Sequence, residues 1–259
     1  MVPPHDCAPL LERLAEMGRL AVVQAASAGT DWLEPWVPQG VALCSARGAR
    51  DIAVAEWVLT AILAMEKRIG ETGRAQDEHV WRPFIANELA GQRALVVGAG
   101  AIGRHLASML RGLGVEVEAV ASSARAGVHG VEDLAGLLPQ AEIVVLLVPL
   151  TSATRGMFDE QMLSLMRQGA LLVNASRGPV VNTAALSEAL SAGRIRAALD
   201  VTDPEPLPSE HPLWDAPGLF LTPHLAGDSP QAEERTYRLI GDQIRRYVNG
   251  EELLNRVAR

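Results

Sequence analysis

The sequence predicts an α/β protein with a doubly wound parallel sheet and a second, smaller α/β domain. Three observations support this prediction. The 259 residues are enough for two domains. From residue 91 onward, short apolar runs alternate with segments of helical period. A glycine-rich turn joins the first of these runs to a helix. Alternating strands and helices favour a parallel sheet with right-handed crossovers.

The first third of the chain predicts the smaller domain. Its pattern predicts a helix over 8–17, short strands over 20–24 and 41–44, and a long helix that begins near Asp51. That helix is apolar on most sides, which is typical of a helix buried in a domain or a subunit interface. The polar stretch 74–89 is interpreted as the crossing into the second domain. We therefore expect one domain over 1–82 and 229–259, and the other over 83–228.

The second domain is predicted element by element from the alternation. The expected strands cover 93–98, 115–121, 142–149, 170–174, 195–201 and 218–222. The expected helices cover 102–112, 131–138, 158–167, 183–192 and 229–248.

The turn Gly98-Ala99-Gly100-Ala101-Ile102-Gly103 follows the apolar run 94–97 and opens a helix. Strand, glycine turn and helix in this order form the context of a dinucleotide-binding fingerprint. Gly98 permits the tight turn, Gly100 lets a pyrophosphate approach the backbone, and Gly103 lets helix and strand pack closely. The helix N-terminus offers N–H groups and a partial positive charge to the phosphates. The sequence therefore predicts a Rossmann-type domain.

The end of the second expected strand bears on the choice of cofactor. An acid about 20 residues after the glycines often binds the ribose 2′-hydroxyl of NAD, and Glu118 stands at that spacing. Glu118 lies inside the strand, however, whereas the strand ends at Ala121 and is followed by Ser122, Ser123 and Arg125. Two hydroxyls and a guanidinium suit a 2′-phosphate. We expect NADP to be the preferred cofactor, with NAD as the second candidate. The alternative interpretation of this loop is that its side chains are solvated and bind no phosphate.

The composition restricts the classes of partner and the cellular location that we expect for this protein. There are 23 Lys and Arg against 31 Asp and Glu, with a formal charge of −8, and no basic cluster suggests nucleic-acid binding. The two cysteines suggest a reducing compartment. The apolar runs are strand-sized and no secretory signal is evident, so we expect a cytoplasmic protein without a membrane span. The remaining histidines, which show no metal-binding spacing, are His5, His79, His105, His129 and His211.

Three further segments each follow an expected strand. They are Asn174-Ala175-Ser176-Arg177-Gly178, the segment from Asp200 to Pro208 that contains Glu205, and Thr222-Pro223-His224. With the glycine turn, they occur in the order found in the D-isomer-specific 2-hydroxyacid dehydrogenases, which the chain resembles from about Leu20 onward. That family includes phosphoglycerate dehydrogenase and glyoxylate/hydroxypyruvate reductases.

The resemblance implies roles for these residues. Arg177 would bind the substrate carboxylate, His224 would be the general acid in reduction, and Glu205 would keep His224 protonated. Glu205 also matters because the related formate dehydrogenases place Gln there. The loop Ser27–Asp31 resembles the family's substrate loop, so substrate binding is expected at Ala28, Gly29, Arg177 and His224. Cofactor binding is expected at Gly98, Gly100, Ala101, Ile102, Gly103, Ser122, Ser123, Arg125, Pro149, Ala175, Ser176, Asp200 and Gly227.

The resemblance also raises a question at the start of the chain. The family begins with a further strand, helix and strand, and Met1–Pro4 resembles the tail of that second strand. We therefore expect a flavodoxin-like substrate domain that lacks its opening unit. The implied function is reduction of a 2-oxo acid such as glyoxylate or hydroxypyruvate, with phosphoglycerate chemistry less favoured, in a homodimer. The alternatives are a dinucleotide-sensing binding protein, like the family's corepressor relatives, and a truncated inactive paralogue.

Overall fold

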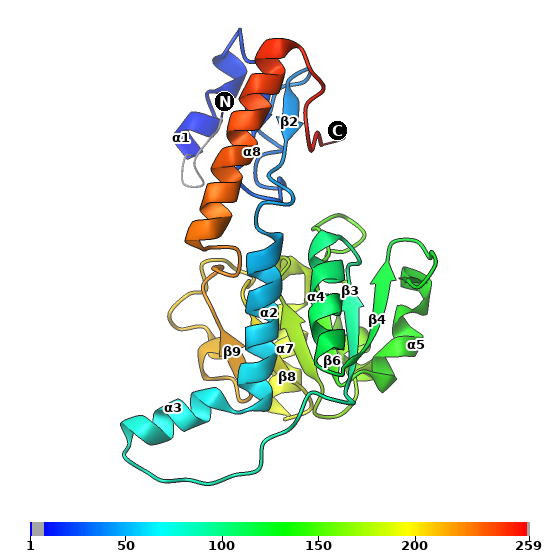
Figure 1. Cartoon of the computed structure of the whole chain (residues 1–259). Coiled ribbons are helices and arrows are strands. Elements are labelled where there is room, and N and C mark those ends of the chain that lie inside the picture. The colour runs from blue at the N-terminus through cyan, green and yellow to red at the C-terminus, as the bar shows by residue number, and fades with distance from the viewer. Residues whose placement is uncertain (2–7, 258–259) are drawn as a thin grey trace. The chain divides into compact units, whose positions relative to one another are not determined.

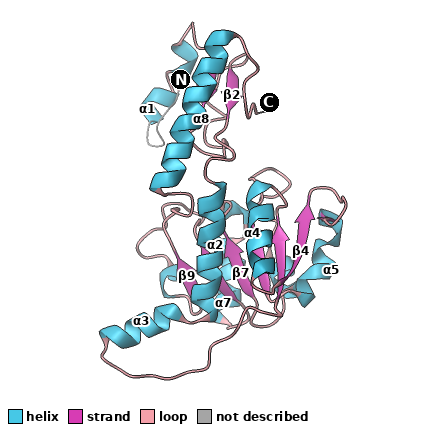
Figure 2. Ribbon diagram, in the orientation of Figure 1, coloured by secondary structure: helices cyan, strands magenta, loops and turns pink. Residues whose placement is uncertain are grey.

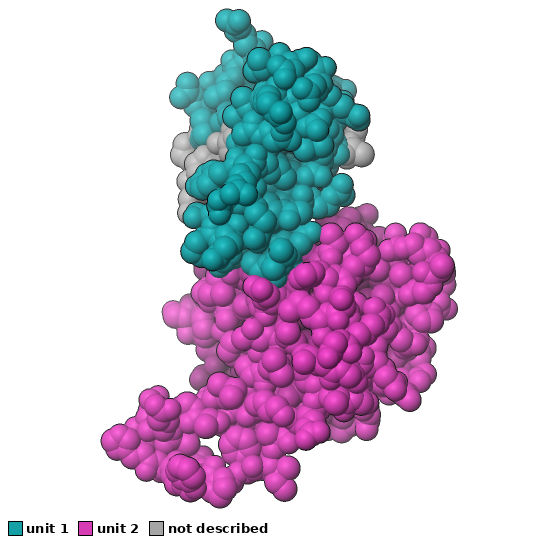
Figure 3. Space-filling view, viewed as in Figure 1, with its two compact units in different colours: residues 1–53, 227–259 teal, residues 54–226 magenta. Residues whose placement is uncertain are grey.

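The computed structural model describes Met1 and residues 8–257. The chain divides into two compact units (Figures 1 and 3). Unit 1 comprises residues 1–53 and 227–259, and unit 2 comprises residues 54–226. Within the described ranges, no helix is long and apolar enough to cross a membrane.

Unit 2 is built on a seven-stranded sheet in which every strand pair is parallel (Figure 2). The strand order is β5-β4-β3-β6-β7-β8-β9, so the order reverses between β3 and β6. In such sheets, ligands bind outside the carboxyl ends of the strands at this reversal point. The strands are β3 (Arg93–Val97), β4 (Glu116–Ala121), β5 (His129–Gly130), β6 (Ile143–Leu146), β7 (Leu171–Asn174), β8 (Arg196–Leu199) and β9 (Leu219–Leu221).

Helices cover both faces of this sheet, which explains why β6 and β7 are buried at every position. One face packs against α2 (Asp51–Glu66) and α4 (Ala101–Gly112), which contribute buried side chains such as Ile62 and Leu106. The other face packs against α5 (Leu134–Leu137), α6 (Glu160–Leu165) and α7 (Thr183–Ser191). The predicted doubly wound α/β architecture is confirmed.

Two elements of unit 2 differ from expectation. The helix predicted over 131–138 is divided into η2 (Val131–Asp133), α5 and η3 (Leu138–Gln140). Gly136 and Pro139 weaken a continuous helix here, because glycine costs backbone entropy and proline lacks an amide hydrogen. The two-residue strand β5 was not predicted, since it is too short to show a periodic pattern. Two further 3₁₀ turns are η4 (Gly178–Val180) and η5 (Pro212–Asp215).

The division between the units also differs from the predicted boundary at residue 82. Beyond residue 53, α2 buries Ala55, Val58 and Ile62 in the same core as β3, so residues 54–82 group with unit 2. Part of the polar stretch 74–89, which the sequence predicts as the crossing between domains, is helical, because α3 (Ile69–Asp77) extends into it. In α3 only Ala75 is buried, so the sequence carries no apolar period there.

Unit 1 contains a small parallel sheet of β1 (Val22–Gln24) and β2 (Ala42–Cys44). The long helix α8 (Pro230–Asn249) belongs to the same unit, and its buried Gln243 Nε2 donates to Gln24 Oε1 at 2.9 Å. The helix predicted over 8–17 is broken into α1 (Ala8–Leu11) and η1 (Leu14–Glu16).

The predicted strand tail at the start of the chain lies largely outside the described residues, because it includes Val2–Pro4. Met1 itself is described, and its amino group donates to the Val22 carbonyl at 2.8 Å. Its carbonyl accepts from the Gln24 amide, also at 2.8 Å. These two bonds have the pattern of a parallel strand pair with β1.

Candidate active site

The glycine turn after β3 is as tight as its sequence predicts. Gly98 has φ +121°, and a Cβ there would lie 2.5 Å from the Leu147 carbonyl oxygen. A Cβ on Gly103 would lie 2.1 Å from the Gly98 carbonyl oxygen, so close packing of α4 on the turn requires glycine. A Cβ on Gly100 would meet no atom within 4 Å, so the space beside it is open. The turn and the N-terminus of α4 therefore fit a dinucleotide pyrophosphate.

The end of β4 agrees with the expected strand boundary. β4 ends at Ala121, and Ser122, Ser123 and Arg125 follow as exposed residues. Arg125 Nη2 donates to the Ala99 carbonyl at 3.0 Å, which brings its guanidinium beside the glycine turn. Glu118 lies within the strand, and its carboxylate is 3.6 Å from His129 Nε2. The carboxyl end of β4 therefore carries no acidic side chain.

The segment after β7 is shaped by Asn174, which is only 1% exposed. Its Oδ1 accepts from the Ser176 amide at 3.0 Å and the Ser176 hydroxyl at 2.7 Å. Its Nδ2 donates to the Arg177 carbonyl at 3.0 Å. Sequence reasoning assigned Asn174 no role of its own. The sequence feature that could have identified Asn174 is a polar residue at the end of an otherwise apolar strand.

The backbone just after Arg177 lies against the loop that follows β8. A Cβ on Gly178 would lie 1.9 Å from the Thr202 carbonyl oxygen, so only glycine lets the two segments approach this closely. Because β7, β8 and β9 are neighbours in a parallel sheet, the loops that follow them all leave the sheet at the carboxyl ends of the strands. This arrangement gathers the predicted catalytic residues Arg177, Glu205 and His224 from three separate segments.

The closest contact among them joins His224 Nδ1 to Glu205 Oε1 at 2.5 Å. The hydrogen bond from Glu205 raises the pKa of His224, while partial burial and the Arg177 charge oppose the rise. The same bond lowers the pKa of Glu205. Both side chains are about two-fifths exposed, at 44% and 42%, so the pair can be reached by a small molecule. The contact with Glu205 therefore favours the protonated form of His224, which has a proton to offer to a ligand.

Asp200 organises the loop that carries His224. Its buried carboxylate accepts from the Thr222 hydroxyl at 2.6 Å, the Leu225 amide at 2.8 Å and the Ala226 amide at 2.9 Å. Its carbonyl accepts from the His224 amide at 2.7 Å. His224 has φ +52°, a backbone conformation that non-glycine residues rarely adopt. These four bonds hold the residue in that conformation. Asp200, predicted only as a cofactor residue, thus also positions the imidazole.

The other predicted site residues lie in both units. Pro149 follows β6 in unit 2, and its carbonyl accepts from the Thr154 hydroxyl at 2.6 Å. Ala175 lies beside the buried Ser176 in the segment after β7. Gly227, Ala28 and Gly29 belong to unit 1. The cofactor-binding and substrate-binding roles of these residues stay predictions.

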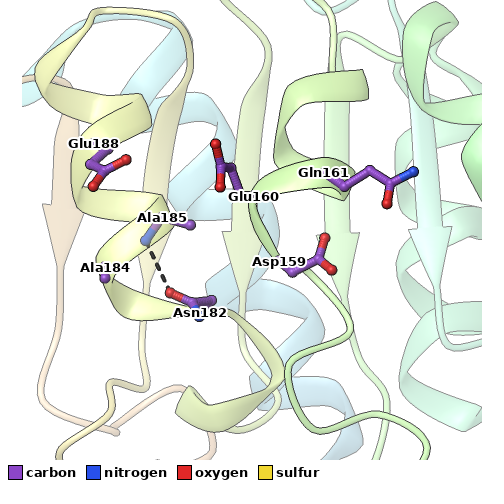
Figure 4. Close-up of a pocket in the computed structure, with 7 residues that line it drawn as sticks. All are labelled: Asp159, Glu160, Gln161, Asn182, Ala184, Ala185 and Glu188. Carbon is purple, nitrogen blue, oxygen red and sulfur yellow. Dashed lines mark hydrogen bonds between the residues drawn. The ribbon is translucent and has the colours of Figure 1, made fainter.

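A hollow of about 460 Å³ lies elsewhere on unit 2, between the N-terminal ends of α6 and α7 (Figure 4). Its lining includes the carboxylates of Asp159, Glu160 and Glu188 and no basic side chain. The side chain of Asn182, which also lines it, accepts from the Ala185 amide as the cap of α7. An acidic lining repels the phosphates of a dinucleotide, so this hollow does not suit the predicted cofactor.

Comparison with known proteins identifies a matching family. Residues 59–226 match the family model described as the NAD-binding domain of the D-isomer-specific 2-hydroxyacid dehydrogenases. D-3-phosphoglycerate dehydrogenase of Mycobacterium tuberculosis is 32% identical over 93% of this chain. The chain spans 47% of that relative, or about half its length.

Two solved structures extend the comparison. A D-isomer-specific 2-hydroxyacid dehydrogenase from Xanthobacter autotrophicus, solved with NADPH and MES, is 35% identical with a TM-score of 0.83. The match covers 99% of this chain and 82% of that one. An NADPH-dependent glyoxylate/hydroxypyruvate reductase from Sinorhizobium meliloti, solved with NADP and sulfate, is 27% identical with a TM-score of 0.87. That match covers 99% of this chain and 83% of that one.

Proposed function

Since the chain belongs to the D-isomer-specific 2-hydroxyacid dehydrogenase family, we propose that it reduces a short 2-oxo acid to the D-2-hydroxy acid with NADPH as cofactor. The observation that carries the proposal is the 2.5 Å contact of His224 with Glu205, within the field of the Arg177 charge. When bound, NADPH supplies the hydride that reduces the carbonyl carbon.

His224 is the proposed general acid. Glu205 engages Nδ1, so Nε2 is the nitrogen that gives its proton to the carbonyl oxygen of the substrate. The Glu205 hydrogen bond raises the pKa of His224, which favours the protonated imidazole that reduction of the substrate requires. In the reverse reaction, the neutral imidazole accepts the hydroxyl proton. Glu205 also argues against formate dehydrogenase chemistry, since that branch of the family places Gln at this position.

Arg177 is the proposed carboxylate-binding residue. Its planar guanidinium suits two parallel hydrogen bonds to a substrate carboxylate. Asn174 and Gly178 fix the backbone on either side of it, which limits the directions in which the side chain can point. Ala28 and Gly29 of unit 1 are further proposed substrate-binding residues, by resemblance to the family's substrate loop.

The preference for NADP rests on the end of β4, where Ala121 stands in place of an acid. The NADP-bound and NADPH-bound relatives support it. A carboxylate at this position would accept hydrogen bonds from the ribose 2′-hydroxyl of NAD and repel the 2′-phosphate of NADP. We therefore expect Ala121→Asp to shift the ratio of kcat/KM for NADPH over NADH by about tenfold or more toward NADH, which corresponds to about 1.4 kcal/mol. Unchanged cofactor selectivity would contradict the assignment.

Glyoxylate and hydroxypyruvate are the proposed substrates, as the named activity of the Sinorhizobium meliloti relative supports. The test is NADPH oxidation with glyoxylate, hydroxypyruvate and 3-phosphohydroxypyruvate. Turnover of the first two and not the third is the expected result. NADPH binding without oxidation of any 2-oxo acid would instead favour a dinucleotide-sensing protein.

A homodimer is proposed from the segment 69–86, here called the arm. Figure 1 shows α3 and the loop after it extending away from the sheet of unit 2. The arm exposes Trp81 at 96% and Ile85 at 95%, with Ile69 and Val80 also exposed. Its base is fixed, because the buried carboxylate of Glu66 accepts from Asn87 Nδ2 at 2.8 Å. Large apolar side chains on an anchored arm are typical of a surface that a partner covers, and we propose a second copy of this chain.

The double variant Trp81→Asp/Ile85→Asp is expected to convert the dimer to a monomer, because charged side chains would have to be buried without partners. Light scattering coupled to size exclusion measures the mass. Val248→Asp is the matched control, since Val248 is 76% exposed on α8, and it should leave the dimer intact. A monomeric unmodified protein, or a double variant that stays dimeric, would refute the proposed arm interface.

A further inference from the structure

The carbonyl oxygen of Ala99, inside the glycine turn, accepts hydrogen bonds from two guanidinium groups. Arg104 Nη1 donates to it at 3.2 Å, and Arg125 Nη2 donates to it at 3.0 Å. Arg104 lies in the first turn of α4, whereas Arg125 lies in the loop after β4, so different elements deliver the two cations. Both residues are exposed.

These two cations lie close together without a compensating acid. Several surface arginines pair with carboxylates, as Arg93 does with Glu116 and Arg238 with Glu234. Among the described residues, neither Arg104 nor Arg125 forms an ion pair with a carboxylate. A single carbonyl dipole offsets their mutual repulsion only in part. The pair is therefore suited to a ligand group that carries two negative charges.

We propose that Arg104 is a second specificity-determining residue, which binds the 2′-phosphate of NADP together with Arg125. This inference rests on the proposed NADP preference and adds to it a residue that the sequence did not single out. A phosphate dianion accepts bidentate hydrogen bonds from two guanidiniums at once. Without the dinucleotide, the Ala99 carbonyl holds both side chains beside the turn. With it, the 2′-phosphate replaces the carbonyl as their acceptor.

The competing role for Arg104 is a contact with the pyrophosphate, since it stands in the first turn of α4. The two roles predict different results, because NADH and NADPH share the pyrophosphate and only NADPH carries the 2′-phosphate. The experiment measures the Kd of NADPH and of NADH by titration calorimetry for the unmodified chain, Arg104→Gln and Arg125→Gln. Each variant is expected to bind NADPH roughly 10- to 100-fold more weakly, as the loss of a charge-assisted bond predicts. NADH affinity should change less than about twofold.

Two further variants complete the design. Arg111→Gln is the matched control, because Arg111 is an exposed arginine at the other end of α4 whose Nη2 donates to the Val117 carbonyl. It should change neither affinity. Arg104→Lys keeps the charge without the planar fork, so it should recover part of the NADPH affinity.

The outcomes separate the two proposals. If Arg104→Gln weakens NADH and NADPH equally, or weakens neither, the role assigned to Arg104 is overturned while the NADP preference stands. If the unmodified chain binds NADH more tightly than NADPH, the proposed cofactor preference itself is wrong. A steeper fall of NADPH affinity with added salt than of NADH affinity, lost in Arg104→Gln, would support the charge-based mechanism.

Discussion

Replacing His224 with Asn is expected to lower kcat for 2-oxo acid reduction by roughly 10²- to 10⁴-fold, the usual contribution of a positioned general acid. Asn retains a polar side chain of modest size but has no titratable proton to give. Asp200 forms four hydrogen bonds to the loop that carries His224, through its carboxylate and its backbone carbonyl. Their donors are the Thr222 hydroxyl and three backbone amides, so none of them needs the imidazole and all remain available in the variant. NADPH affinity should therefore stay within about threefold, a difference of under about 1 kcal/mol. A fall in kcat of less than tenfold would contradict the assigned role.

The pH profile tests the partner of His224. The protonated imidazole is the active form in reduction, so kcat/KM should fall as the pH rises through the pKa of His224. Because the Glu205 hydrogen bond raises that pKa, the fall should lie above the usual titration range of histidine. In Glu205→Gln this main cause of the rise is lost, while burial and the Arg177 charge still lower the pKa. The alkaline limb should therefore move to lower pH.

Glu210→Gln is the control for that experiment. Glu210 is an exposed carboxylate of the same loop, and its Oε2 accepts from the Ser209 hydroxyl at 2.6 Å. Its replacement should leave the alkaline limb where it is. If Glu205→Gln also left the limb in place, Glu205 would not control the protonation of His224.

Replacing Arg177 with Gln is expected to lower kcat/KM for a 2-oxo acid by about 10²- to 10³-fold or more. Two charge-assisted hydrogen bonds to the carboxylate would be lost, and each such bond contributes about 1.5–3 kcal/mol. Most of the loss should appear in KM if the clamp acts mainly on the ground state, and in kcat if it also polarises the carbonyl. Initial rates over a range of glyoxylate concentrations separate the two effects.

The chemistry of the substrate offers an internal check on that variant. A 2-oxo amide carries no carboxylate, so Arg177→Gln should reduce its turnover much less than that of the matching 2-oxo acid. Arg167→Gln is the control, because Arg167 precedes the amino end of β7, whereas Arg177 follows its carboxyl end. Arg167 forms an ion pair with Glu142. Equal losses for the acid and the amide would mean that Arg177 does not bind the carboxylate.

Much of unit 2 could be predicted from local patterns. The strand β3 and the helix α4 were recognisable because an apolar run, a glycine turn and a helical period follow each other without a gap. The strands β6 and β7 were recognisable because strands covered on both faces read as continuous apolar runs. The break of the predicted helix 131–138 was harder to foresee, since Gly136 and Pro139 are tolerated in some helices and only their combination with the surrounding packing divides it.

The candidate site was predictable in part for a related reason. The residues Arg177, Glu205 and His224 stand just after strands, and parallel strands bring such positions to one edge. The hydrogen bonds that hold those residues in place were not predictable, because they join positions such as Asp200 and Leu225 that no periodic pattern relates. The two arginines at Ala99 likewise come from separate elements.

The sequence by itself determined the strand-and-helix order of unit 2, the glycine turn and the family. Each of these depends on neighbouring residues or on short motifs in order. Only the tertiary structure decided that α2 groups with unit 2 beyond residue 53, that Asp200 holds the His224 loop, and that Arg104 meets Arg125. Those facts depend on which side chains meet across the fold, and contacts between distant residues are set by packing and not by any local pattern.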